Sequence, residues 1–99
     1  MTTVSVLLTL GIPGARSLKD KRSVVRSLVE RLRGRLDLSA AEVGLQEEHR
    51  RAQIGYAVVS GSPSVARELA EDALRFAERE LIGRAEIIDV VRDEQVLAG

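Results

Sequence analysis

The sequence predicts an α+β sandwich, in which a four-stranded antiparallel sheet carries two helices on one of its faces. Segments 3–11 and 52–60 alternate apolar residues with the period of two that strands require. Segments 17–34 and 63–82 repeat apolar residues at helical spacing, and each begins at or beside a serine that can cap a helix. Weaker strand patterns at 36–43 and 84–92 complete the sheet.

The composition is that of a soluble domain, with 44% hydrophobic and 30% charged residues. A length of 99 residues suffices for its own core, so we expect 1–99 to form a single domain. Without cysteine the chain has no disulfide and no thiolate metal site. The apolar run after Met1 is too short to span a bilayer and lacks the basic start of a signal peptide, so we expect a cytoplasmic protein without a membrane partner.

The first helix is expected at 17–34. Ser17 can cap its first turn, and Asp20 follows three residues later, which is a variant of the capping box. Gly34 stands where a left-handed C-terminal cap would fall, after arginines that suit the negative end of the helix dipole. The buried face of the helix is expected to consist of Leu18, Val25, Leu28, Val29, Leu32 and Leu36.

The middle of the chain is expected to form two strands joined by a polar loop at 46–51. In 36–43 the alternation slips near Glu42, and a slip of this kind predicts a β-bulge. In 52–60 the side chains of Ile54, Tyr56 and Val58 share one face, which we expect to pack against the helices.

The second helix is expected to begin with Ser62 as its cap and Pro63 in its first turn, and to stop at Gly83. A last strand at 84–92 then closes the sheet, and we expect the final residues to fray. Right-handed crossovers leave one dominant arrangement of the six elements, the ferredoxin-like sandwich with strand order 4-1-3-2. The residues that this helix is expected to turn toward the core are Val65, Ala66, Leu69, Ala70, Ala73, Phe76, Ala77 and Leu81.

Three segments, IPGARSLKDKRSVVRSLVERLR, AEV and RAQIGYAVVSG, resemble in this order and spacing the YlxP-like family of small bacterial proteins. The resemblance extends over nearly the whole chain, and it implies a ferredoxin-like fold and a protein without an established biochemical activity. Genes of the family often lie among those for transcription elongation, translation initiation and ribosome maturation, which implies work near ribosomes. Members often carry an aromatic residue about where His49 stands and an Asp-His pair near Gly44 and Leu45, so this chain departs from the family in its central loop.

Positive charge is concentrated in the first helix. Residues 16–35 carry eight basic and two acidic side chains, a net charge of +6, although the whole chain is neutral. Basic residues on one helix face are typical of phosphate-binding surfaces and predict contact with structured RNA, such as ribosomal RNA. The alternative is a solvated flank whose arginines pair with Glu68, Glu71 and Asp72 on the second helix. The candidate RNA-binding residues are Arg16, Lys19, Lys21, Arg22 and Arg26.

The turn before this helix is a candidate anion site. Gly11 and Gly14 make the turn flexible, and Ser17 opens a helix whose first backbone N–H groups favour anions. The alternative is a connecting turn that needs glycine for its shape, because the pattern is neither a Walker sequence nor a dinucleotide fingerprint.

Catalysis and metal binding find little support in the sequence. His49 is the only histidine, and with Glu47 and Glu48 it makes a poor set of metal ligands. A histidine in a surface loop is the simpler interpretation. No Ser-His-Asp or Cys-His set can be assembled, so we expect neither an enzyme nor a bound cofactor or metal.

The sheet face turned away from the helices offers another function. Leu7, Val59 and Ile88 are expected there, and an exposed apolar patch often marks an interface, although long side chains can also cover it. Base stacking on the sheet is not expected, because Tyr56 is the only aromatic residue of the central strands and points toward the helices. Two functions remain: a non-enzymatic accessory protein that binds RNA, and a protein-interaction or homo-oligomerisation module, with a homodimer as its simplest form.

Overall fold

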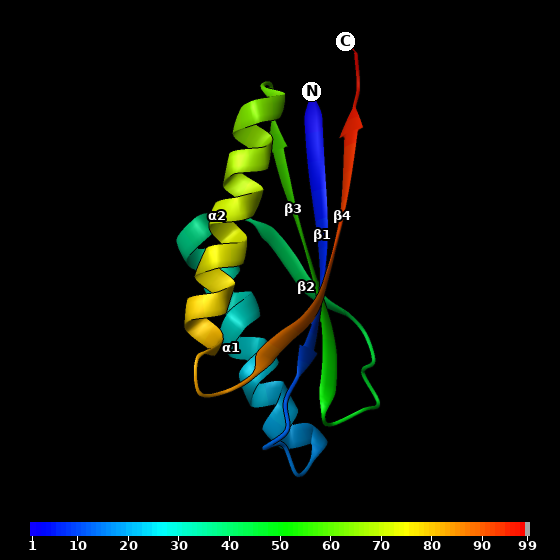
Figure 1. Cartoon of the computed structure of the whole chain (residues 1–99), viewed down its shortest axis with the longest axis vertical. Helices are drawn as coiled ribbons and strands as arrows, with labels where there is room; N and C mark the ends of the chain where they lie inside the picture. The colour runs from blue at the N-terminus through cyan, green and yellow to red at the C-terminus, as the bar shows by residue number, and fades with distance from the viewer. Residues whose placement is uncertain (99) are drawn as a thin grey trace.

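The computed structural model describes residues 1–98 and confirms the predicted order of elements (Figure 1). The strands form one antiparallel sheet in the order β2-β3-β1-β4, as predicted, and both helices lie on the same side of it (Figure 1). The fold class is therefore the predicted ferredoxin-like sandwich. Its elements are β1 (Thr2–Gly11), α1 (Leu18–Leu36), β2 (Ser39–Gly44), β3 (Arg51–Ser60), α2 (Pro63–Leu81) and β4 (Glu86–Val96).

The core lies between the sheet and the two helices. Alternate residues of β1 and β3 point into it, because successive side chains of a strand face opposite sides of the sheet. The apolar stripe of α1 is buried at its centre and half-buried at Leu18 and Leu36. The buried residues of the two central strands and of α1 are Val4, Val6, Leu8, Leu10, Ala52, Ile54, Tyr56, Val58, Val25, Leu28, Val29 and Leu32.

The prediction that Gly34 ends α1 is wrong, because Gly34 is an interior residue of a longer helix. The helix continues to Leu36, which packs against the core. The left-handed residue is Asp37, with φ 56°, and its N–H donates to the carbonyl of Leu32. Aspartate adopts this conformation more readily than most residues, since its short side chain can bond locally. Burial of Leu36 therefore outweighs the stop signal of the glycine.

The bulge predicted near Glu42 is confirmed. The register between β2 and β3 shifts between Glu42 and Gly44, and β2 starts only at Ser39 because α1 ends late. The shift lets Glu42 face the helix side while Val43 leans over the outer face, where its Cγ1 would lie 3.3 Å from a Cβ placed on Gly55.

The last strand begins later and ends later than predicted. Gly83, with φ 77°, turns the chain after α2, and the N–H groups of Arg84 and Ala85 donate to the carbonyl of Leu81. The expected fraying is wrong as far as Val96, which stays paired with Thr2 of β1, and the last residue lies outside the described part of the chain. Pairing with a buried central strand holds these residues in place.

The second helix buries a narrower face than predicted. Its buried stripe is centred on small residues such as Ala66, Ala70 and Ala77, which let the helix approach the sheet closely. Val65 and Leu69 each lie one residue before this stripe, about 100° around the helix, and both are exposed. Within residues 1–98, neither helix is long and apolar enough to cross a membrane.

Candidate nucleic-acid interface

The exposed side of α1 carries a row of cations, Lys19, Arg22 and Arg26, which we call the basic ridge. A groove of about 550 Å³ follows one side of the ridge and is lined in part by Ser23 and Ser27. A second groove of about 330 Å³ lies on the other side, between α1 and β2. Arg22 and Arg26 line both grooves, so they stand on the crest between them.

The cations of the basic ridge have no acidic partners within residues 1–98. Of the acids of α2 that were expected to neutralise them, Glu71 pairs with Arg92 at 2.8 Å and Asp72 pairs with Arg75, while Glu68 forms no ion pair within residues 1–98. The expected pairing of the ridge with α2 is therefore wrong, whereas a solvated flank without these pairs stays the alternative to RNA binding.

The groove beside the ridge is lined mainly by side chains that carry hydrogen-bond donors. Arg31 lines it and is held by Glu80 of α2, while Arg84 donates to Oγ of Ser27 at 3.3 Å. Glu30 is the one acidic side chain in the lining. Phosphate and sugar oxygens are contacted chiefly by Arg, Lys and Ser side chains, so the groove offers the groups that a nucleic-acid backbone needs.

Lys21 does not belong to this surface, although the sequence groups it with the phosphate-binding residues. It stands four residues before Val25, on the buried stripe of α1, and its exposed fraction is 0%. Its Nζ donates to the carbonyl oxygens of Leu45 at 2.8 Å and Gln46 at 3.2 Å, and lies 3.3 Å from the carboxylate of Glu42. Lys21 therefore fixes the β2–β3 loop to α1 and cannot meet a phosphate on the surface.

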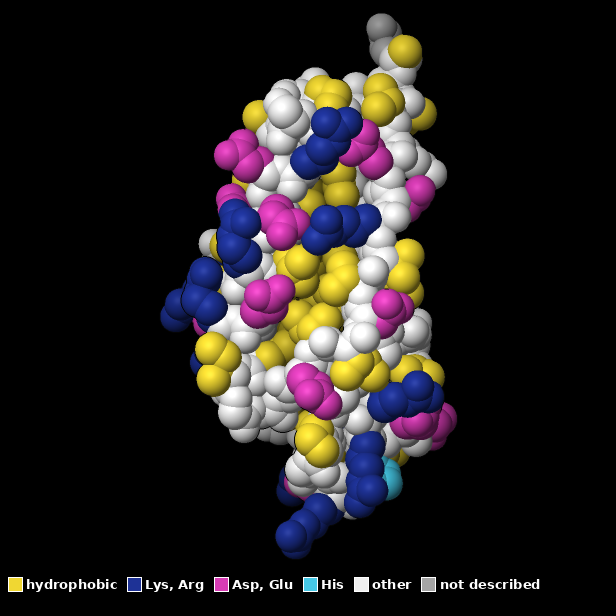
Figure 2. Space-filling view, viewed as in Figure 1, with side chains coloured by type: hydrophobic (Ala, Val, Ile, Leu, Met, Phe, Trp, Pro, Cys, Tyr) yellow, Lys and Arg dark blue, Asp and Glu magenta, His cyan; other side chains and the backbone are white. Residues whose placement is uncertain are grey.

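A further exposed cation, Arg50, lies at the end of the molecule where the chain turns into α1. The β2–β3 loop, which carries the half-buried His49, lies against the turn before α1, where the Ile12 N–H donates to the Arg50 carbonyl at 2.8 Å. This brings Arg50 close to the segment that carries the exposed Arg16. Lys and Arg side chains gather at this end (Figure 2). Arg50 could not be found from the sequence, because only tertiary packing brings its loop to the turn before α1.

The turn before α1 already contains an acceptor of its own. Oγ of Ser17 accepts from the Asp20 N–H at 3.2 Å, and the Asp20 carboxylate accepts from the Arg16 N–H at 2.8 Å. The start of the helix therefore carries a negative charge, which opposes the binding of another anion. Gly11 belongs to β1, and Gly14 lies in open space. This arrangement speaks against an anion site at the turn.

The uncovered face of the sheet carries the three residues predicted for it. Val59 and Ile88 are exposed and Leu7 is half-buried. Tyr56 points the other way, as predicted, and its hydroxyl donates to the Ala70 carbonyl at 2.8 Å. Burial raises the pKa of Tyr56 to about 12. The outer face thus lacks the aromatic side chains on which RNA-binding sandwiches stack bases.

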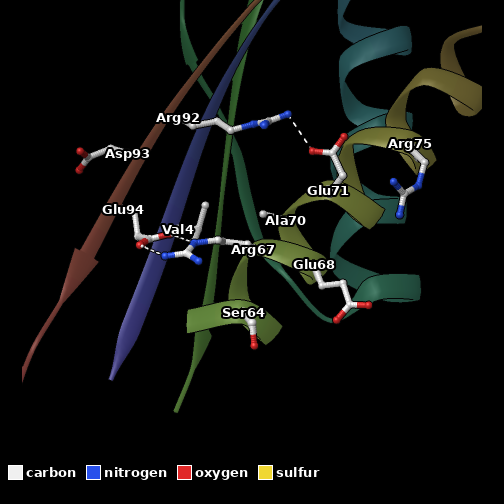
Figure 3. A pocket seen from close by; sticks show the side chains of 10 residues that line it. All are labelled: Val4, Ser64, Arg67, Glu68, Ala70, Glu71, Arg75, Arg92, Asp93 and Glu94. Carbon is white, nitrogen blue, oxygen red and sulfur yellow. Dashed lines mark hydrogen bonds and ion pairs between the residues drawn. The ribbon is translucent and has the colours of Figure 1, made fainter. Parts of the chain in front are cut away.

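A groove of about 650 Å³ that the sequence did not indicate runs between α2 and β4 (Figure 3). Two ion pairs cross it, Arg67 with Glu94 at 2.7 Å and Arg92 with Glu71 at 2.8 Å. Hydrogen bonding from Arg67 holds the pKa of Glu94 below its usual value. In Figure 2 the groove is an apolar strip crossed by charged side chains. Its lining contains three arginines and four carboxylates, so it does not favour an anionic ligand.

Comparison with solved structures shows the same fold. A de novo designed protein with a ferredoxin fold superposes with a TM-score of 0.61 at 13% identity, over 100% of this chain and 89% of that one. A dimeric ferredoxin-like protein from an uncultured marine organism gives 0.54 at 13% identity, over the full length of both chains. SnoaB, a cofactor-independent oxygenase from Streptomyces nogalater, gives 0.57 at 6% identity, over 100% of this chain and 96% of SnoaB. Identities this low indicate the fold alone.

Comparison of sequences identifies the family. The family described as "protein of unknown function (DUF503)" matches residues 3–92. The uncharacterized protein YlxP of Bacillus subtilis (strain 168) is 31% identical over 64 residues, which cover 65% of this chain and 70% of YlxP. The YlxP-like resemblance is therefore confirmed, and the chain belongs to the DUF503 family of proteins of unknown function.

Proposed function

We propose that this protein is a non-enzymatic accessory protein that binds structured RNA, with ribosomal RNA as the first candidate, through the basic ridge of α1. The observation that carries the proposal is the free state of the ridge. Its three cations are exposed and, within residues 1–98, form no ion pair, whereas Arg31, Arg67 and Arg75 on the two helices each have an acidic partner. The gene neighbourhood that the family implies supports a place near ribosomes.

The ridge is suited to contacts with the nucleic-acid backbone. From Lys19 to Arg26 it extends over about 10 Å of helix axis, a length over which a duplex strand presents about three phosphates. The hydroxyls of Ser23 and Ser27 can add hydrogen bonds from the adjoining groove. Since phosphates are alike in every sequence, the expected recognition is of RNA shape and backbone, with little reading of bases.

Co-sedimentation of the tagged protein with separated ribosomal subunits tests this proposal. The protein is expected to sediment with a subunit at low salt, and photocrosslinkers beside Arg22 or Arg26 are expected to yield a defined RNA segment. Crosslinks scattered over the whole RNA, or no sedimentation at low salt, would count against it.

A second candidate function is that of an interaction module acting through the sheet. It is favoured by three valines of the uncovered face, Val43, Val59 and Val91, which are 54%, 60% and 52% exposed. A neighbour of similar fold is described as dimeric, which supports self-association as the simplest form. Light scattering over a concentration series is expected to show a mass that rises toward twice the monomer. Unlike RNA binding, this apolar association is not expected to weaken with salt.

A further inference from the structure

Apolar residues form a row across the uncovered face of the sheet. In the register of the strands, Leu7 of β1 lies between Gly55 of β3 and Val91 of β4. Val43 of β2 leans over Gly55, so that its Cγ1 would lie 3.3 Å from a Cβ at that glycine. The row therefore crosses all four strands, and we call these four residues the apolar band.

The rows beside the band are polar, and their charge is unevenly distributed. On one side the strands place Ser39, Ala57, Ser5 and Asp93 in one row. Asp89, on the other side of the band, and Asp93 both belong to β4 and are exposed. The outer face thus has an apolar centre between two polar rows, with Val59 and Ile88 exposed beyond those rows, and an acidic edge at β4. An apolar centre with polar surroundings is the usual anatomy of an interface.

We propose that a second copy of this chain covers this face, in a symmetric dimer whose two-fold axis runs parallel to the strands, between β1 and β3. This inference rests on the second candidate function. Two sheets packed face to face keep their strands roughly aligned, so the axis can run either along the strands or across them. An axis along the strands places β4 over the partner's β2, whereas an axis across them places β4 over the partner's β4.

The acidic edge decides between these two orientations. Asp89 and Asp93 lie two residues on either side of Val91 in the band. An axis that runs across the strands along the band would therefore place Asp89 over the partner's Asp93, and like charges that face each other across an interface are unfavourable. An axis along the strands instead places Asp93 over the partner's Ser39, because these residues end the same row at opposite edges of the sheet. It also sets Leu7 over the partner's Gly55, the one position of the band without a side chain.

The available area fits a dimer of moderate affinity. The four strands are 10, 6, 10 and 11 residues long. With strands about 4.8 Å apart, they present about 600 Å² of surface on one face. Two such faces bury about 1,200 Å², which is at the lower end of the range for specific interfaces. We therefore expect a dimer that dissociates on dilution.

The orientation can be tested by crosslinking, because the chain contains no cysteine. Val59 lies on β3 beside the proposed axis, about one strand spacing to the side of the partner's Val59, whereas Val91 lies near the sheet edge and far from the partner's Val91. Facing sheets lie about 10 Å apart, too far for a disulfide, so a short bismaleimide is the suitable reagent. At concentrations where sedimentation shows a dimer, the Val59→Cys protein is expected to crosslink at least tenfold faster than the Val91→Cys protein.

The possible outcomes separate the geometry from the association. Faster crosslinking of Val91→Cys would contradict an axis along the strands but would still support a dimer through the sheet face. A dimer that crosslinks at neither position would overturn the use of this face. A monomer mass at every concentration would overturn the association itself.

As a second test, Leu7→Ser is expected to weaken dimerisation at least tenfold, while Leu69→Ser on the exposed side of α2 leaves it unchanged. Equal effects of the two substitutions would also contradict the proposal.

Discussion

Lys21 reaches from α1 to the β2–β3 loop, where it donates to two carbonyl oxygens and lies beside the Glu42 carboxylate. Such a group is costly to bury unless all its hydrogen bonds are made. Here the cost is offset by three partners, and the result is a fixed loop at the end of the molecule where the basic ridge begins. The first segment of the family resemblance opens with IPGARSLKDKR, which ends one residue beyond this lysine, so part of that segment serves structure rather than ligand binding.

Replacement of Lys21 by methionine is expected to lower the free energy of unfolding by about 2–4 kcal/mol, because it leaves two carbonyls and a partly buried carboxylate without their partner. Lys19→Met on the same helix provides the matched control. Lys19 is exposed, so its replacement is expected to change stability by about 0.5 kcal/mol or less. Urea denaturation gives both values, and equal midpoints for the two variants would show that Lys21 is not the anchor described.

Burial of Tyr56 is expected to make the folded protein less stable at alkaline pH. Its pKa in the folded protein is about 12, against about 10 in an unfolded chain. The folded state thus holds the phenolic proton more tightly, and the corresponding stability is complete below about pH 10 and is lost as the pH rises toward about 12. The loss amounts to at most about 2–3 kcal/mol.

Urea midpoints of the parent and of Tyr56→Phe at neutral and at high pH provide the measurement. As the pH rises, the urea midpoint of the parent is expected to fall relative to the midpoint of the Tyr56→Phe variant. Because this is the only tyrosine, the absorbance of tyrosinate reports its titration directly. A titration near the usual tyrosine value in the folded protein would contradict the role of burial.

At the scale of elements, local signals predict where helices and strands exist better than where they end. Ser17 and Ser62 cap their helices as predicted, because a cap is a bond within one turn of the chain. The end of α1 depends instead on whether Leu36 can reach the core, and that depends on β2 and β3. The exposure of Val65 and Leu69 also depends on tertiary packing. The spacing of apolar residues in α2 does not say which part of its apolar face the sheet covers.

Gly34→Ala tests the corrected end of α1. Gly34 is an interior residue of the helix, and a Cβ added there would meet no other atom. Its replacement by alanine is therefore expected to raise the free energy of unfolding by about 0.5–1 kcal/mol. If Gly34 were a left-handed cap, the same change would destabilise, because alanine resists that conformation. A rise in melting temperature supports the helix as described, and a fall contradicts it.

At the scale of the whole molecule, the neutral chain separates its charges. The basic ridge lies on α1, while acidic residues such as Asp89 and Asp93 lie on the outer face of β4. The sequence predicted the ridge, because helical spacing groups Lys19, Arg22 and Arg26 without any knowledge of the fold. It could not exclude Lys21 or add Arg50, since the burial of one and the neighbourhood of the other depend on the β2–β3 loop.

The central claim, that the ridge binds RNA through phosphates, is tested most directly by the salt dependence of RNA binding. The variant carries Lys19→Glu, Arg22→Glu and Arg26→Glu. The control carries Arg67→Glu, Arg75→Glu and Arg79→Glu, which reverses as many exposed charges on α2 and so changes the net charge equally. Circular dichroism confirms that both are folded before their binding to ribosomal RNA hairpins is measured.

In a plot of log affinity against log salt concentration, each lost phosphate contact is expected to reduce the slope by roughly one unit. The ridge variant is expected to lose two to three units of slope and most of its affinity at low salt, while the control keeps the slope of the parent. Equal losses in both variants would mean that only net charge matters, and unchanged binding by the ridge variant would contradict the proposed interface.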